Sequence, residues 1–160
     1  TLLAHSMGNR ALTQAFLALK SEIDTKKFRI FKEIILAAPD VDADVFQKQI
    51  APALIASNAN VTLYASSNDE ALIASKAVNG AARAGDSTGG PVVIKGIESI
   101  DATNVDTNLF GGLRHAYVAD SREVLSDLKY LVVNGLRASK RFGLDPVPNP
   151  GDPQYWSFKK

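Results

Sequence analysis

The chain has 160 residues, of which 46% are hydrophobic, and its formal net charge at neutral pH is +1. This length and composition fit one globular domain and exclude a disordered chain. The balanced charge gives no reason to expect nucleic acid as a partner. The absence of cysteine excludes disulfides, thiol catalysis and thiolate metal sites. No apolar run approaches the roughly 20 residues that a membrane-spanning helix needs, so no transmembrane segment is expected.

Short apolar runs alternate with helical patterns along the chain. They predict strands at 2–5, 34–38, 61–65 and 92–97, and helices at 10–20, 43–57, 70–84 and 120–139. Near-continuous apolar strands separated by helices are typical of a parallel sheet covered on both faces. We therefore predict an α/β fold with a mostly parallel sheet of about four strands. Asp120, with Glu123 in the following turn, is expected to cap the last helix.

The last part of the chain has a different composition. Prolines recur after residue 143, and an aromatic cluster follows them at 155–158. Proline excludes a regular helix here, and aromatic clusters rarely stay solvated. We predict a main unit of residues 1–142 and an extended tail, 143–160, that packs on it.

The segment Ala4-His5-Ser6-Met7-Gly8 stands between the first predicted strand and the first predicted helix. Strand and helix nearly touch at a nucleophile elbow, so the residues two before and two after the serine must be small, as Ala4 and Gly8 are. This layout predicts that Ser6 is a nucleophile with a φ angle above zero. The backbone N–H of Met7 is then the expected oxyanion donor.

A nucleophilic serine needs a base and an acid that orients the base. The chain has two histidines. His5 would point away from the Ser6 hydroxyl, and we expect it to be a packing or oxyanion-loop residue. His115 follows the last predicted strand and is the expected base. Asp69 follows the strand at 61–65 and is the expected acid, because the carboxyl ends of parallel strands meet at one edge of a sheet.

Other interpretations stay open for these residues. Asp69 could simply begin a helix, since acidic residues suit a helix N-terminus. His115 could be an ordinary loop residue. Four other carboxylates are alternatives for the acid: Asp40, Asp42, Asp101 and Asp106.

Two further motifs suggest phosphate chemistry. The run 40–44, with three aspartates, resembles the loop of haloacid-dehalogenase-type phosphohydrolases that act with Mg²⁺, and Asp86 resembles their later acidic residue. Pro39 and the lack of a following threonine speak against this reading. The plainer one is a helix N-cap at Asp42. Residues 85–90 lack the lysine of a phosphate-binding loop and are expected to form a flexible turn. Otherwise no metal or cofactor is expected.

The chain resembles a family of mainly bacterial α/β-hydrolases of unknown function. The resemblance extends to about residue 136 and rests on four blocks, at 2–10, 35–42, 64–72 and 115–117. It implies an α/β-hydrolase fold with Ser6 as nucleophile and His115 as base, and it places Asp69 where a triad acid is expected. In such proteins several strands precede the elbow, and we therefore expect this chain to correspond to the C-terminal half of the domain.

We therefore predict a serine hydrolase of the esterase, lipase or acyl-transfer type, acting on a small or medium acyl substrate. Leu109, Phe110 and Leu113, beside the base, are expected to form an apolar rim for that substrate. The alternatives are a non-catalytic domain of the same fold, an inactive fragment or, more remotely, the Mg²⁺-dependent phosphohydrolase. The expected partner is the missing N-terminal half, or a second copy paired across the edge of the strand at 2–5.

Overall fold

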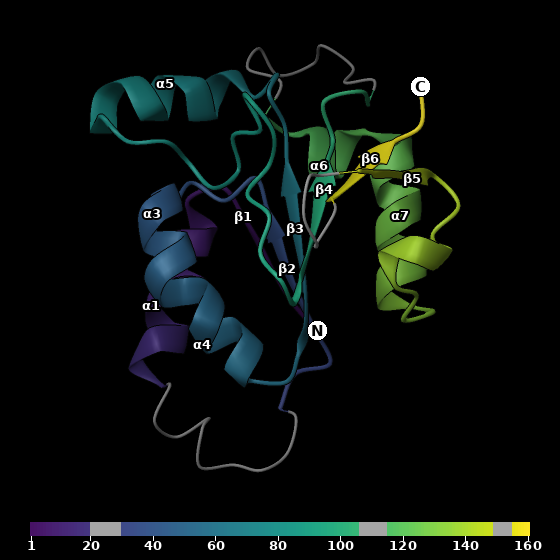
Figure 1. Cartoon of the computed structure of the whole chain (residues 1–160), viewed down its shortest axis with the longest axis horizontal. Coiled ribbons are helices and arrows are strands. Elements are labelled where there is room, and N and C mark those ends of the chain that lie inside the picture. The colour runs from purple at the N-terminus through teal and green to yellow at the C-terminus, as the bar shows by residue number, and fades with distance from the viewer. Residues whose placement is uncertain (20–29, 106–114, 149–154) are drawn as a thin grey trace.

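A six-stranded sheet organises the computed structural model, which describes residues 1–19, 30–105, 115–148 and 155–160 (Figure 1). The strand order is β1-β2-β3-β4-β6-β5; every neighbouring pair is parallel except β5 and β6. The α/β class and the mostly parallel sheet are confirmed. The strands are β1 (Leu2–His5), β2 (Glu33–Ala37), β3 (Asn60–Ala65), β4 (Ile97–Asp101), β5 (Leu144–Val147) and β6 (Tyr155–Phe158).

Helices cover both faces of this sheet. Figure 1 shows α1, α3 and α4 on one side and α6 and α7 on the other, with α5 at the end where the first strands finish. The helices are α1 (Gly8–Ala18), α3 (Ala43–Val45), the π-helix η1 (Phe46–Ile50), α4 (Ala51–Ala56), α5 (Glu70–Asn79), α6 (Tyr117–Asp120), α7 (Arg122–Val132) and the 3-10 helix η2 (Ala138–Lys140). Among the described residues, every helix is too short or too polar to cross a bilayer.

Two hydrophobic clusters fill the space between the helices and the sheet. Ile34 and Leu36 of β2 pack on the side of α1 and α4, whereas Ile35 and Ala37 pack on the side of α7. This alternation follows from the twofold side-chain period of a strand. It explains why β2 is apolar at nearly every position: both of its faces are buried.

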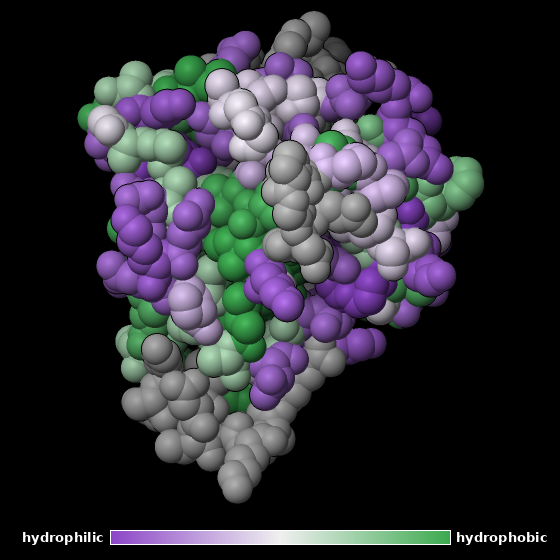
Figure 2. Space-filling view, in the orientation of Figure 1, coloured by the Kyte–Doolittle hydropathy of each residue, from purple (hydrophilic) through white to green (hydrophobic). Residues whose placement is uncertain are grey.

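The strand predicted at 92–97 is wrong, because the fourth strand begins where that run ends, at Ile97. Gly96 has a φ of 97°, which turns the chain and separates the apolar run from the ladder. Val92 and Ile94 are instead partly buried against the cluster beside α4. Their apolar side chains therefore give the sequence a strand-like pattern, although these residues do not pair with a strand. Figure 2, in the same orientation as Figure 1, shows that hydrophobic residues also gather on the surface, between the α3–α4 side and the α6–α7 side.

Three of the predicted helices also differ in detail from those in the structure. Ser121, not Asp120, caps α7, because its hydroxyl accepts the Val124 N–H at 3.3 Å. The helix predicted at 43–57 contains a π-turn; Pro52 lacks the N–H that an α-helix would direct to the carbonyl of residue 48. Gly80, with a φ of 69°, ends α5 earlier than expected.

The tail that was expected to lie extended on the body adds two strands to the sheet. β5 and β6 form an antiparallel pair, and β6 lies beside β4. Pro146 is tolerated in β5 because that strand is at the sheet edge, where a missing N–H leaves no gap in a ladder. These two strands account for the difference between six strands and the expected four.

A buried polar network connects the tail side to the middle of the sheet. The Arg141 guanidinium donates to Asp127 Oδ2 at 2.7 Å and to the Tyr64 hydroxyl at 3.1 Å. Tyr64 in turn donates to the same Asp127 oxygen at 2.6 Å. Burial raises the pKa of Asp127, although the Arg141 charge opposes this. Buried hydrogen bonds thereby join β3, α7 and the segment before β5.

The segment expected to be a flexible turn begins as a buried connection. Gly85 receives Ser66 N–H on its carbonyl and donates to the Pro39 carbonyl, both at 3.0 Å. A Cβ atom at this position would lie 2.6 Å from backbone atoms of Ala38 and Pro39. Gly85 therefore lets the chain pass between the ends of β2 and β3.

Gly85→Ala should lower the free energy of unfolding by about 1–3 kcal/mol, because backbone atoms cannot move aside as a flexible side chain can. The matched control is Gly143→Ala, where the nearest atom would be a Phe158 ring carbon at 3.9 Å. Urea unfolding followed by circular dichroism measures both variants. Equal midpoints for the two would contradict this account of Gly85.

The edge formed by β1 generates a second prediction. Within the described residues β1 pairs with β2 alone, and Leu3 is 50% exposed. Unpaired N–H and C=O groups beside an apolar side chain form a template for another strand. We expect the 160-residue chain to associate in sedimentation velocity, and Leu3→Lys to reduce this association. A thermally robust monomer would contradict the expectation.

Candidate active site

Ser6 forms the turn between β1 and α1. Its φ angle is 54°, which confirms the prediction of a left-handed conformation at this serine. The Ser6 N–H donates to the Ala37 carbonyl at the end of β2, and the Ser6 carbonyl receives the Asn9 N–H, both at 3.0 Å. The unfavourable conformation is thus held from both sides by backbone hydrogen bonds.

Asn9 secures the same turn with its side chain. The residue is fully buried, and its Nδ2 donates to the carbonyls of Ala4 at 3.3 Å, Ser6 at 3.1 Å and Ala37 at 3.1 Å. Its Oδ1 has no hydrogen-bond partner in the described part of the chain. Sequence analysis missed this role. An asparagine in the first turn after the predicted nucleophile is a weak signal, because its acceptor at Ala37 becomes a neighbour only in the folded protein.

His115 and Asp69 meet as expected. Nδ1 of His115 lies 2.8 and 2.7 Å from the two carboxylate oxygens of Asp69, whose side chain is completely buried. Because a carboxylate accepts, Nδ1 carries the proton, which leaves Nε2 with its lone pair in the neutral ring. Asp69 Oδ1 also accepts the Leu72 N–H at 3.0 Å and so caps α5. Both interpretations of Asp69, as helix cap and as partner of His115, therefore hold together.

His5 contacts His115 from the strand that leads to Ser6. Nε2 of His5 donates to the backbone carbonyl of His115 at 3.0 Å, and the two ring centroids are 4.7 Å apart. His5 therefore fixes the backbone of His115 from the β1 side, which sequence analysis did not anticipate.

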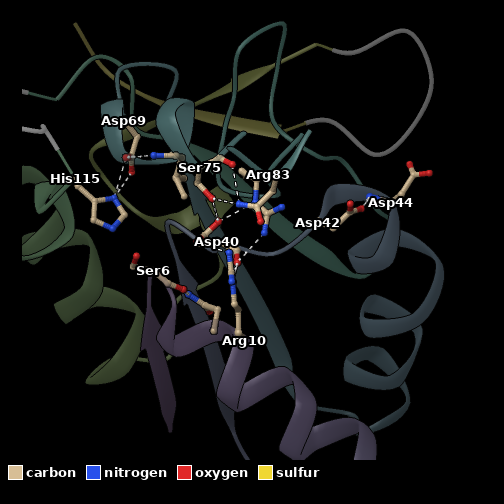
Figure 3. Close-up of polar contacts among 12 residues, drawn as sticks. Ser6, Arg10, Asp40, Asp42, Asp44, Asp69, Ser75, Arg83 and His115 are labelled. Carbon is tan, nitrogen blue, oxygen red and sulfur yellow. Dashed lines mark hydrogen bonds and ion pairs between the residues drawn. The ribbon is translucent and has the colours of Figure 1, made fainter. Parts of the chain in front are cut away.

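One pocket of about 420 Å³ is lined by both Ser6 and His115. Figure 3 shows Ser6 and Asp69 on opposite sides of the His115 imidazole. Met7 also lines the pocket, and the residue is 66% exposed. At the start of α1 the N–H groups of Asn9 and Arg10 bond to the carbonyls of Ser6 and Met7, and the positive end of the helix favours negative charge beside it. The remaining walls are the following: Arg10, Asp40, Ala71, Leu72, Ala74, Ser75, Val78 and Asn79.

The described alternatives to Asp69 have other partners. Asp101 Oδ1 accepts from Ser87 and from both the N–H and the hydroxyl of Thr103. Asp42 caps α3 by accepting the N–H groups of residues 44 and 45, as the plainer reading predicted. Asp106 lies outside the described residues, as do Leu109, Phe110 and Leu113 of the expected rim.

Asp40 is the centre of an ion-pair cluster next to the pocket. Its Oδ1 accepts from Arg83 Nε at 2.8 Å and from the Ser75 hydroxyl at 2.7 Å, and its Oδ2 accepts from Arg10 at 2.8 Å. Burial alone would raise the pKa of Asp40, but Ser75, Arg83 and Arg10 outweigh it and hold the pKa below its usual value. Asp40 is therefore a stable anion at neutral pH.

The aspartates that suggested a phosphohydrolase separate in space. Asp40 binds arginines, Asp42 caps a helix, and Asp44 pairs with Lys48 at 2.7 Å. Asp86 pairs with Lys76 at 3.4 Å. Among the described residues no cluster of three or more acidic or histidine side chains could hold a metal ion. The geometry of these carboxylates does not favour a Mg²⁺ loop.

Asn9→Ala should lower the free energy of unfolding by about 1–3 kcal/mol, because the buried carbonyls of Ser6 and Ala37 lose a donor. Asn9→Asp should cost more, since a carboxylate would face those carbonyls. The control is Asn104→Ala, which removes an exposed amide with one 3.4 Å contact. Urea unfolding checks the order, and an Asn9→Ala variant as stable as the control would contradict it.

The comparisons with known proteins agree with this architecture. A family model described as "Alpha/beta hydrolase of unknown function (DUF900)" matches residues 1–134. Neither the curated proteins nor the solved structures gave a match. The family match covers the elbow, the parallel strands β1 to β4 and the His115–Asp69 pair. The chain therefore belongs to this family of alpha/beta hydrolases of unknown function.

Proposed function

We propose that the protein is a serine hydrolase of the esterase, lipase or acyl-transfer type, with Ser6 as nucleophile, His115 as base and Asp69 as the orienting acid. One observation carries the proposal. The His115 imidazole is bonded through Nδ1 to a buried carboxylate, and it lines the same pocket as a serine in a left-handed turn. The arrangement supplies the three groups of nucleophilic acyl transfer: a serine, a base in the same pocket and a carboxylate that orients the base.

In this mechanism the Ser6 hydroxyl oxygen attacks the carbonyl carbon of an ester while His115 Nε2 takes the hydroxyl proton. Asp69 stabilises the resulting imidazolium through Nδ1. The Met7 N–H donates to the carbonyl oxygen as negative charge develops there. The imidazolium then protonates the departing alcohol, which leaves an acyl group on Ser6. A water or a second alcohol, deprotonated by His115, then attacks the acyl carbon, and the imidazolium gives this proton to the Ser6 oxygen as the acyl–oxygen bond breaks.

The pocket fits small or medium acyl groups. Its volume is about 420 Å³, and α5 contributes the short apolar side chains of Ala71, Ala74 and Val78 to its wall. Such a wall offers an apolar contact surface to an acyl chain. Apolar pockets with a few polar groups are typical of small-molecule sites.

A non-catalytic binding domain of the same fold is the second candidate. The observation that favours it is the supply of oxyanion donors, since the elbow contributes one backbone N–H, that of Met7. Removal of one donor from such a hole typically lowers kcat by about 10²–10³. An elbow that stabilises the oxyanion with one donor would bind carbonyl compounds but turn them over slowly.

Labelling with a fluorophosphonate probe tests the proposal. The wild type should react at Ser6, and Ser6→Ala should abolish the reaction. The matched control is Ser126→Ala, which changes an exposed serine on α7. A folded wild type that resists the probe would overturn the hydrolase proposal in favour of the binding domain.

Asp69→Asn separates the two roles of this residue. Asparagine is as good a helix N-cap as aspartate, so α5 should remain formed and the unfolding midpoint nearly unchanged. Loss of the carboxylate should lower kcat for 4-nitrophenyl butyrate by about 10³–10⁴, because the imidazole loses its correct tautomer. An Asp69→Asn variant with wild-type kcat would remove Asp69 from the mechanism.

A further inference from the structure

Arg10 lines the same pocket as Ser6 and His115. It lies in the first turns of α1, and its side chain is 45% exposed. Figure 3 shows it on the same helix that Ser6 introduces, beside Asp40. The guanidinium is therefore available to a molecule in the pocket.

Asp40 holds Arg10 in place but accepts from only some of the N–H donors of Arg10. Nε of Arg10 donates to the Asp40 carbonyl at 2.7 Å, and Nη2 donates to Oδ2 at 2.8 Å. A guanidinium has five N–H groups. The other three have no acceptor in the part of the chain that the structure describes. Arg10 is thus fixed in orientation and still has unused donors.

The charges around Asp40 do not cancel. The same carboxylate also receives Arg83, whose side chain is 6% exposed and is held by the Asp40 carbonyl as well. Two guanidinium groups share this one carboxylate, and the other carboxylate near the pocket, Asp69, is buried and bonded to His115. An excess positive charge therefore remains at the exposed one of the two, Arg10.

We infer that the pocket selects esters that carry a free, ionised carboxylate in addition to the ester group, and that Arg10 binds this carboxylate. The inference rests on the proposed hydrolase function. A planar fork of N–H donors matches a carboxylate better than it matches a neutral group. The apolar wall of α5 accommodates the methylene chain between the carboxylate and the ester. Arg10 is a specificity residue in this scheme, and the bond-making steps stay with Ser6 and His115.

A pair of matched substrates tests the inference. The 4-nitrophenyl monoester of adipic acid carries a terminal carboxylate, and 4-nitrophenyl hexanoate has the same chain length without it. Wild type should prefer the adipate ester by about tenfold in kcat/KM. In Arg10→Gln the ratio of the two kcat/KM values should fall to about one, and Arg10→Lys should keep part of it.

Arg122→Gln is the control, because Arg122 is an exposed arginine on α7 outside the pocket. It should leave the ratio at the wild-type value. A ratio that is the same in wild type and in Arg10→Gln would overturn the inference, since a purely structural Arg10 would affect both esters equally.

A binding measurement separates this inference from the proposed function. The Arg10 Nε–H resonance, assigned by its loss in Arg10→Lys, should shift saturably when adipate is titrated into ¹⁵N-labelled wild type and should not shift with adipamide. If neither ester is hydrolysed but adipate shifts the resonance, the hydrolase proposal fails and the anion site stands. Absence of a shift at millimolar adipate overturns the anion site, whatever the activity.

Discussion

The buried carboxylate of Asp69 is the contact on which the rest of the site depends. A carboxylate with no exposed surface must be hydrogen-bonded, or its burial would cost several kcal/mol. Asp69 meets this requirement with the Leu72 N–H at the start of α5 and with His115 Nδ1. The imidazole is thus positioned by the need to satisfy a buried anion. His5 adds a bond from β1, so two separate parts of the chain converge on His115.

Crowding at the ends of β1 and β2 keeps the serine in its strained turn. Ser6 and Ala38 follow neighbouring strands, and both have a positive φ, at 54° and 45°. Asn9 bonds to the carbonyls on both sides of this junction, and Gly85 passes so close to Ala38 that no side chain would fit. Conformations of this kind persist when the surroundings leave the backbone no alternative. The fold therefore provides both the strain and the contacts that hold it.

Local patterns were sufficient to predict the elbow, the α/β class and the pairing of His115 with Asp69. Each depends on a residue type at the end of a strand, and parallel strands bring these ends together. The position of β4 could not be predicted, because the half-buried Val92 and Ile94 resemble a strand until Gly96 turns the chain. The contacts of Asn9 and Arg10 were also missed. Their acceptors, Ala37 and Asp40, are distant in sequence and come near only through the β1–β2 pairing.

In the proposed hydrolase, the double role of Asp69 also couples substrate selection to proton transfer. Helix α5 supplies the wall of Ala71, Ala74 and Val78, and its first turn is capped by the carboxylate that orients His115. A change that tilts α5 to widen the pocket would carry the anchor of the imidazole with it. In that case the wall residues are not independent of the base: a larger side chain at Ala71, in the first turn after the cap, would alter the space for the acyl chain and the direction of Nε2 together. Redesign of this pocket would meet that constraint first at the N-terminal turn of α5 and least at its far end, near Val78.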